Sequence, residues 1–174
     1  NPLFTNLKDT GWMLVSPGFE WNLFFKYGKS GEKDLPAHMH SDMCSFDLFY
    51  KDKIIFGEAG ISTYNPNKIR EYERSGQSHN ILQLGYLNKR KKMQWIESVD
   101  VFDTFKAGYK SEPTKMEFSK NNNRSITLKG GHTGFNFFGA DYYRLIKIKE
   151  FSSKKIILMI QENLNLRKNF YFNI

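Results

Sequence analysis

The sequence lacks several features that would restrict its fold. It has one cysteine, Cys44, so an internal disulfide is excluded and stability must come from packing or from a bound metal. It has no apolar run near the roughly 20 residues that a membrane-spanning helix needs, so we expect no membrane insertion. Internal repeats, low-complexity tracts and interdomain linkers are missing too. Because a domain commonly holds roughly 150 residues, the 174 residues are expected to form a single domain, 1–174.

The two ends of the chain lack ordinary signals. The chain opens at Asn1 and Pro2, with no initiator methionine and no basic and apolar leader. Its last strand-like run reaches Ile174 without a polar tail, so this end is expected either to be cut or to pair at a sheet edge. We therefore expect a processed product or a piece of a longer protein.

Charge of one sign is in excess. Lys and Arg number 26 against 18 Asp and Glu, for a formal net charge of +8. Such a surface favours anionic partners, whether nucleic acid, membrane headgroups or acidic polysaccharide, without choosing among them. The dense basic run Lys89 to Lys92 follows a turn-like Leu87-Asn88 and is expected to be a solvated hairpin tip. No zinc-finger spacing, recognition-helix pattern or RNA-binding aromatic signature accompanies it, so we expect no nucleic-acid partner.

Aromatic residues make up 16% of the chain and fall mostly in short alternating runs, which are typical of strands. Turn residues separate these runs. The predicted strands are Trp12 to Ser16, Glu20 to Tyr27, Cys44 to Tyr50, Lys53 to Gly57, His79 to Leu84, Gln94 to Val101, Thr104 to Tyr109, Thr114 to Ser119, Arg124 to Lys129, Tyr143 to Lys149, Lys155 to Gln161 and Asn169 to Asn173. One short helical turn is expected near Asn67 to Tyr72. This pattern predicts an all-β fold, an antiparallel β-sandwich of the jelly-roll or supersandwich kind.

Three of the four histidines fall in a suggestive arrangement: His38, His40 and His79. In an extended segment alternate side chains share a face, so His38, His40 and Asp42 are expected on one side of a strand-like stretch. Two imidazoles and a carboxylate suit a metal or acid–base site. Glu58, after an apolar strand, is either a solvated carboxylate or a further ligand. The spacing equally fits histidines that are structural or merely exposed.

The segment Leu35 to Asp42, followed by Ser45 to Leu48, contains the pattern HxHxD…SFxL. Two further blocks follow in order, Gly57 to Tyr64 and Arg70 to Asn80, and Gly131 to Phe135 begins a later strand. With these blocks the chain resembles the heparinase II/III-like polysaccharide lyases. The likeness covers roughly residues 4 to 161 and is densest between positions 35 and 80.

The resemblance implies a carboxyl-terminal β-sandwich excised from a larger lyase-like protein whose amino-terminal α/α toroid is missing. The implied activity is β-elimination at a uronic acid of an acidic polysaccharide such as a glycosaminoglycan or alginate. Because the toroid would supply the other reacting groups, the isolated domain is expected to be inactive. A periplasmic or secreted location is favoured by the family.

The resemblance also implies roles for single residues. His38 takes a catalytic or charge-neutralising role, and Tyr64 and Tyr72 are catalytic candidates. Arg74 is a candidate substrate contact. The implied ligands of a structural metal, zinc with calcium as the alternative, are His40, Glu58 and His79. Asp42 is expected behind them as an acceptor that orients a histidine, and His132 as a packing residue.

Several positions depart from the family pattern. Glu58 stands where Asp is usual, Gly76-Gln77 replaces Thr-Ala, and Thr133 replaces a later Asp. A noncatalytic carbohydrate-binding or scaffold module of the same fold is therefore an alternative. A cupin also has an HxH ligand pair, but its acidic ligand is absent from positions 44 and 45, which hold Cys44 and Ser45.

Overall fold

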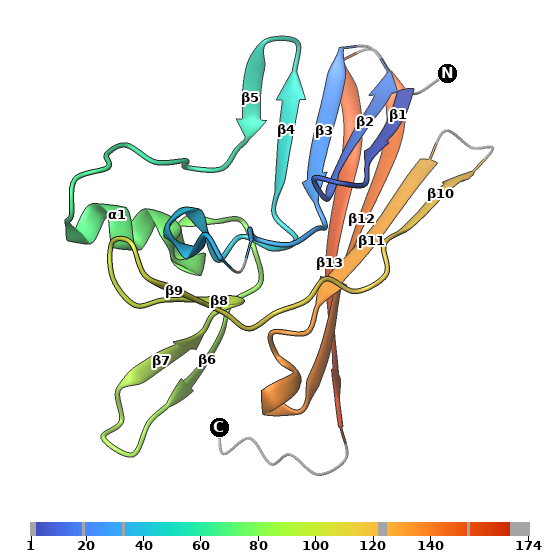
Figure 1. Ribbon diagram of the computed structural model, residues 1–174. Coiled ribbons are helices and arrows are strands. Elements are labelled where there is room, and N and C mark those ends of the chain that lie inside the picture. The colour runs from blue at the N-terminus through green and yellow to red at the C-terminus, as the bar shows by residue number, and fades with distance from the viewer. Residues whose placement is uncertain (1–2, 19, 33, 122–124, 153, 168–174) are drawn as a thin grey trace.

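The structure is a computed structural model that describes residues 3–18, 20–32, 34–121, 125–152 and 154–167 (Figure 1). Two larger antiparallel sheets dominate it. The first has the order β1-β2-β3-β4-β5, formed by β1 (Leu3–Leu7), β2 (Trp12–Gly18), β3 (Trp21–Lys26), β4 (Phe46–Tyr50) and β5 (Lys53–Phe56). The second has the order β10-β11-β12-β13, formed by β10 (Glu117–Asn121), β11 (Ser125–His132), β12 (Ala140–Ser152) and β13 (Lys155–Leu166).

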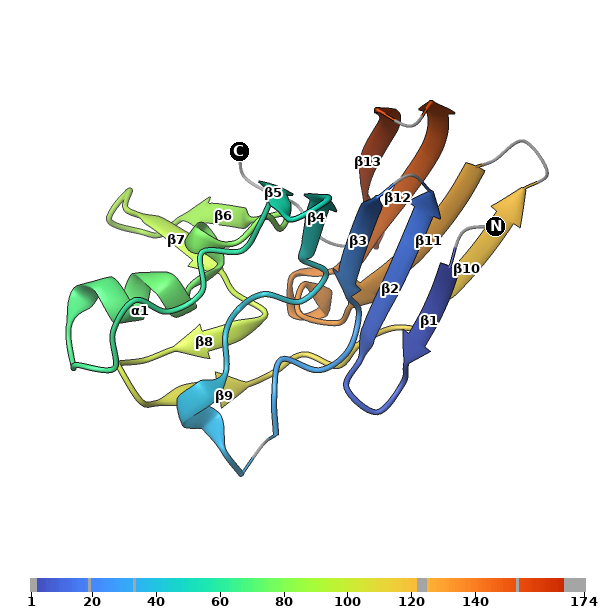
Figure 2. The same cartoon turned by 90° about the horizontal axis from the view of Figure 1, so that it is seen from above.

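Figure 2 shows these two sheets as two layers. Along β2 every second side chain is buried, which is the period of a strand with one face in a core. The apolar core between the layers draws on both sheets and includes Met13, Val15, Leu23, Phe25, Phe46, Leu48, Ile126, Leu128, Ala140, Tyr142, Ile146 and Ile148. The predicted β-sandwich is confirmed.

A smaller region lies beside the sandwich (Figure 1). It carries the 3-10 helices η1 (Pro36–His38) and η2 (Gly76–Ser78), helix α1 (Lys68–Arg74), and the hairpins of β6 (Leu84–Leu87) with β7 (Met93–Ile96) and β8 (Val99–Val101) with β9 (Ala107–Tyr109). A third 3-10 helix, η3 (Asn136–Phe138), connects β11 to β12 of the second sheet. The side chain of Asn67 accepts a hydrogen bond from the Arg70 amide and caps α1, so the expected helical turn is confirmed. Among the described residues, no helix has the length and apolar character needed to cross a bilayer.

Three strand predictions are wrong, and each fails where backbone groups bond to side chains. The stretch 94–101 is two strands, because the Ser98 amide donates to Ser41 Oγ at 2.9 Å between β7 and β8. The stretch 79–83 is irregular, because the Asn80 amide donates to Glu58. The stretch 37–42 begins in η1 and continues as a loop. Such bonds offer the backbone an alternative to a ladder.

Three further segments remain to be compared with the sequence predictions: the basic run, the first strand and the carboxyl-terminal strand. The basic run 89–92 lies at the tip of the β6–β7 hairpin, as expected. Strand β1 was not predicted as a separate element. The predicted strand Asn169 to Asn173 lies outside the described residues.

Candidate functional site

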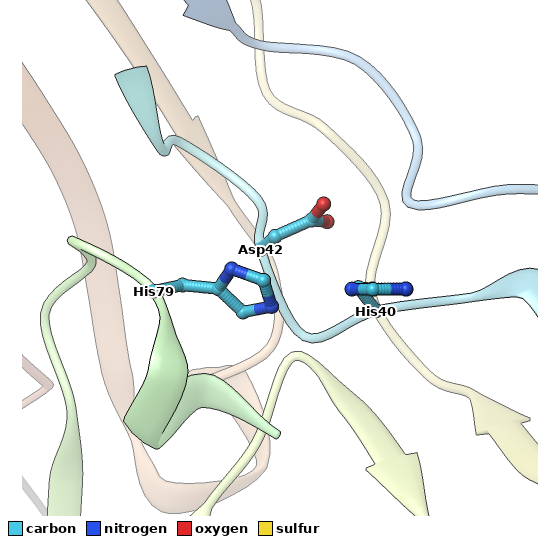
Figure 3. Close-up of side chains that lie close together, drawn as sticks. All are labelled: His40, Asp42 and His79. Atoms are coloured by element: carbon cyan, nitrogen blue, oxygen red, sulfur yellow. The ribbon is translucent and has the colours of Figure 1, made fainter. Parts of the chain in front are cut away.

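Three side chains converge beside the sandwich: His40, Asp42 and His79 (Figure 3). One nitrogen or oxygen of each lies within 4.8 Å of the others. His40 and Asp42 come from the loop between η1 and β4, whereas His79 follows η2. The two imidazole ring centroids are 5.4 Å apart. Segments almost 40 positions apart therefore build one cluster of metal-ligating groups.

The loop that carries His40 is held by buried partners. Arg74 Nε donates to the Met39 carbonyl at 2.9 Å, and the Ser41 amide donates to the Arg74 carbonyl at 2.8 Å. Ser41 Oγ accepts from the Ser98 amide. Because Ser41 and Arg74 are both 0% exposed, water does not compete for these bonds, and they fix the loop without a strand ladder.

Asp42 has a cationic neighbour at the end of β3. Lys26 Nζ lies 2.6 Å from both carboxylate oxygens, and the two side chains are only 11% and 15% exposed. A carboxylate offers about four lone-pair positions, so Asp42 can accept from Lys26 and still bind another cation. The ion pair fixes the position of the Asp42 carboxylate in the cluster.

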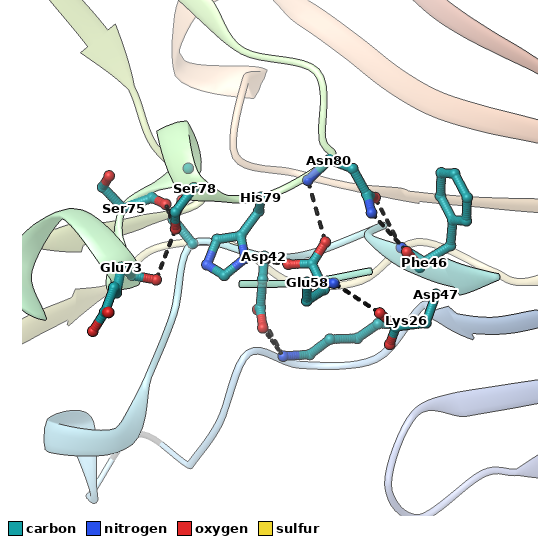
Figure 4. A network of polar contacts seen from close by, with 12 residues as sticks. Lys26, Asp42, Phe46, Asp47, Glu58, Glu73, Ser75, Ser78, His79 and Asn80 are labelled. Carbon is teal, nitrogen blue, oxygen red and sulfur yellow. Dashed lines mark hydrogen bonds and ion pairs between the residues drawn. The ribbon is translucent and has the colours of Figure 1, made fainter. Parts of the chain in front are cut away.

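His79 is oriented by a second carboxylate (Figure 4). Glu58 Oε2 contacts Nδ1 of His79, and Glu58 Oε1 accepts from the Asn80 amide at 3.2 Å. The Asn80 side chain accepts from the Phe46 amide at 3.0 Å and donates to the Phe46 carbonyl at 2.6 Å, as a strand residue would. The Glu58 amide in turn donates to Asp47 Oδ1 at 2.8 Å. This network leaves the His79 ring little freedom, with its side chain 2% exposed.

The electrostatics of the cluster favour neutral, electron-donating imidazole. Burial lowers the pKa of His40 to about 4, and the nearby His79, Lys26 and Arg74 act in the same direction, against the opposing charge of Asp42. His40 is therefore neutral near pH 7, the form that binds metals. Nε2 of His79 is buried with no hydrogen-bond partner among the described residues. An orphaned imidazole nitrogen beside a second imidazole and a carboxylate fits a zinc ion.

His38, two positions before His40 in the sequence, forms an exposed pair with Tyr64. His38 ends η1, and its ring centroid is 6.4 Å from that of Tyr64, whose side chain is 63% exposed. The Arg70 guanidinium carbon lies 4.6 Å from the Tyr64 ring centroid, and Arg70 Nη2 donates to the Ala37 carbonyl at 3.4 Å. Arg70 is 0% exposed, so a buried cation supports both members of the pair.

The other two predicted contact residues lie differently. Tyr72 is 53% exposed on α1, and its hydroxyl donates to the Gln77 carbonyl at 3.3 Å. Arg74 is 0% exposed and also donates through Nη1 to the carbonyls of Asp103 and Thr104, at 3.0 and 2.5 Å. It follows Arg70 by four positions, so both lie on the buried helix face. The structure thus places Arg74 in the interior, where its guanidinium holds the carbonyls of Met39, Asp103 and Thr104.

The positions of one histidine and two carboxylates can be compared with the expectations from the sequence. His132 packs in the core at 2% exposure, as expected. Glu58, expected as a metal ligand, contacts Nδ1 of His79. Asp42, expected behind the ligands, lies in the cluster itself. Asp42 is held by Lys26.

Sequence reasoning missed four supporting residues: Lys26, Ser41, Arg70 and Asn80. The spacing of Arg70 and Arg74 within the predicted helix was a usable signal, since residues four apart share a helix face. Asn80 adjoins His79 in a motif block and was also within reach. Lys26 and Ser41 carried no local signal, because their partners are distant in the sequence.

Comparison with known proteins identifies the family of the chain. A family model described as "Heparinase II/III-like, C-terminal" matches residues 1–168. No curated protein and no solved structure matches the chain. The family match spans both large sheets and every residue of the cluster, and it relates the chain to polysaccharide lyases. The chain therefore belongs to the heparinase II/III-like family, as a carboxyl-terminal domain.

Proposed function

We propose that this domain is part of a lyase that cleaves an acidic, uronic-acid-containing polysaccharide by β-elimination. The observation that carries the proposal is the exposed pair of His38 and Tyr64, in which His38 precedes the cluster residue His40 by two positions in the sequence. Family membership supports the polysaccharide class. The net charge of +8 favours a polyanionic substrate.

β-Elimination breaks the C5–H bond and the bond from C4 to the leaving oxygen, and it forms a C4–C5 double bond. It needs a base for the proton, a donor for the leaving oxygen, and groups that stabilise the charge beside the carboxylate. His38 and Tyr64 are the exposed groups suited to proton transfer, with Tyr72 as a further candidate. An amino-terminal helical toroid of the same protein is proposed to supply the remaining groups.

We propose further that the cluster holds zinc, with calcium as the alternative. The orphaned nitrogen of His79 and the neutral His40 fit zinc better than calcium, which prefers oxygen ligands. The geometry supports His40, Asp42 and His79 as donors with Glu58 orienting His79, whereas the family resemblance suggests Glu58 as a donor. When bound, the ion supplies structural organisation beneath the reacting surface.

Elemental analysis of the purified protein tests the metal assignment. The expected result is close to one zinc per chain. Asp42→Asn is expected to abolish binding, whereas Glu58→Gln weakens it by about ten- to a hundredfold, as loss of an orienting partner does. Asp100→Asn is the control, because Asp100 pairs with Lys110 and is not a member of the cluster. No metal in the wild type, together with unchanged thermal stability of His40→Ala, would refute the assignment.

Turnover of acidic polysaccharides by the full-length protein tests catalysis. Formation of the unsaturated uronate product is followed by its ultraviolet absorbance. His38→Ala is expected to lower kcat/KM by at least about a hundredfold, the usual contribution of general acid–base catalysis. Equal turnover by His38→Ala and the wild type contradicts the proposed role of His38.

A noncatalytic carbohydrate-binding module is the second candidate. The burial of Arg74 favours it, because one expected substrate contact is directed into the interior. Binding of the polysaccharide without turnover by the full-length wild type would establish this second candidate instead.

A further inference from the structure

The β6–β7 hairpin is a two-stranded ribbon that projects from the rest of the molecule in both views (Figures 1 and 2). Its register pairs Leu87 with Met93 and Gly85 with Trp95. Successive pairs along a two-stranded ribbon face opposite sides, so the side chains of Leu87, Met93 and Trp95 share one face. Leu87 is 60% exposed, Met93 50% and Trp95 44%. One face of the ribbon is therefore an exposed apolar surface.

The opposite face anchors the ribbon. Ile96 is 4% exposed and belongs to the core cluster, with Leu84 packed against it. The Tyr86 ring centroid is 5.8 Å from that of Phe138 in η3. Just beyond β7, Glu97 Oε2 accepts from the Gly76 amide at 2.8 Å. Folding thus uses one face of the ribbon and leaves the other to solvent.

Gly85 gives the exposed face its shape. A Cβ at this position would lie 3.0 Å from a ring carbon of Trp95 and 2.7 Å from Met93 Sδ. The indole and the thioether lie close against the strand because glycine has no side chain there. With one side of the indole on Gly85 and 44% of the residue exposed, the outer side of the ring faces solvent. Trp95 is a flat platform on a supported strand.

Four consecutive cations stand at the tip beside this platform: Lys89, Arg90, Lys91 and Lys92, all exposed. The tip is ordered by Asn88, whose side-chain oxygen accepts from the amides of Arg90 and Lys92, both at 3.0 Å. Lys91 adopts a positive φ of 56° that closes the turn. The turn therefore holds the basic run directly beyond Leu87 and Met93.

We propose that this ribbon binds an acidic glycan. The apolar C–H face of a sugar ring stacks on Trp95, and carboxylate or sulfate groups of neighbouring sugars pair with the cations of the tip. The inference rests on the proposed function, because it names a second contact for the same class of substrate. The ribbon recruits the polymer and takes no part in the elimination.

Charge complementarity selects this occupant. A lipid surface would be entered through apolar side chains at the leading end, where the ribbon instead has four cations. A second copy of the ribbon would bring two such basic runs close together, and like charges repel. An acidic polymer matches both the charges and the aromatic platform.

Binding of fluorescently labelled heparin, alginate and hyaluronan octasaccharides to the purified protein tests the proposal. Trp95→Ala is expected to weaken binding of at least one of them roughly tenfold, an effect typical of losing an aromatic stacking platform. The double variant Lys89→Gln with Arg90→Gln should weaken binding and reduce its salt dependence, because screened charge pairs are lost. Neutral cellohexaose should show no dependence on the tip charges.

Matched controls separate the ribbon from general surface effects. Phe137→Ala removes an aromatic ring that is 84% exposed outside the ribbon, and Lys120→Gln with Lys147→Gln removes the same charge from the second sheet. Both are expected to bind like the wild type. Near-ultraviolet circular dichroism and thermal melting check that each variant is folded.

Several results would overturn the inference. The first is that the wild type binds none of the three octasaccharides. The second is that folded Trp95→Ala binds them with wild-type affinity. The third is that Trp95 mediates binding to phosphatidylserine vesicles, or to a second copy of the chain, and not to the glycan. The proposed lyase function fails by a separate measurement, the turnover of His38→Ala. A catalytically inactive wild type that still binds glycan through Trp95 leaves the ribbon inference standing.

Discussion

The buried His132 makes the stability of this domain depend on pH. Its ring lies 4.8 Å from that of Phe135 and 4.7 Å from that of Tyr142, measured between centroids, and it is 2% exposed. Nδ1 accepts from the Gly134 amide at 3.1 Å. Burial, reinforced by the cations of Arg144 and Lys110, lowers the pKa of His132 to about 4.

The sign of the effect follows from proton binding in the two states. The unfolded chain protonates this histidine near its ordinary pKa of 6.5, whereas the folded protein resists protonation until about 4. Stability is therefore complete above pH 6.5 and is lost as the pH falls from 6.5 through 4. The depression corresponds to about 3 kcal/mol in full, of which about 2.5 kcal/mol is lost by about pH 4.5.

Urea unfolding of metal-free wild type and His132→Gln between about pH 7.5 and pH 4.5 measures this contribution. Gln cannot titrate, so the variant is less stable at neutral pH but loses about 2.5 kcal/mol less on acidification. His38→Gln is the matched control, because it makes the same substitution at an exposed histidine. Parallel pH profiles of His132→Gln and the wild type would refute the reasoning.

Three further substitutions or reactions have definite expected outcomes. Asn80→Ala leaves the Phe46 amide and carbonyl without their side-chain partner and should lower the free energy of unfolding by about 2 kcal/mol in urea titration. Arg74→Met should increase hydrogen exchange at the Ser41 amide, because the loop that it holds is released; unchanged exchange would show that other contacts suffice. Burial raises the pKa of Cys44 to about 12, so a thiol reagent should label the protein only after denaturation, and rapid labelling of the folded protein would contradict the burial.

Local pattern was a good guide where a strand has one buried face. The alternating residues of β2 and β3 were predicted as strands, and both pack against the core as the pattern requires. The turn residues around Asn88 correctly indicated a hairpin tip. In these segments the backbone forms hydrogen bonds with a neighbouring strand, so the two-residue alternation in the sequence matches the alternation of buried and exposed side chains in the structure.

The pattern failed where side chains take the place of a strand. Asn80 pairs with both backbone groups of Phe46, and Ser41 accepts from the Ser98 amide. These partners lie 34 and 57 positions apart, so no local period can reveal them. The contact of Ser41 with Ser98 also holds the loop that carries His40 and Asp42.

For this protein the sequence alone determined the β-sandwich and the family, because alternation and ordered motif blocks are local properties of the chain. It also singled out His38, His40 and His79. Only the tertiary structure decided that Asp42 enters the cluster and that Arg74 turns into the interior. The reason is physical: burial and ion pairing depend on Lys26 and on distant backbone carbonyls, which folding alone brings to these side chains.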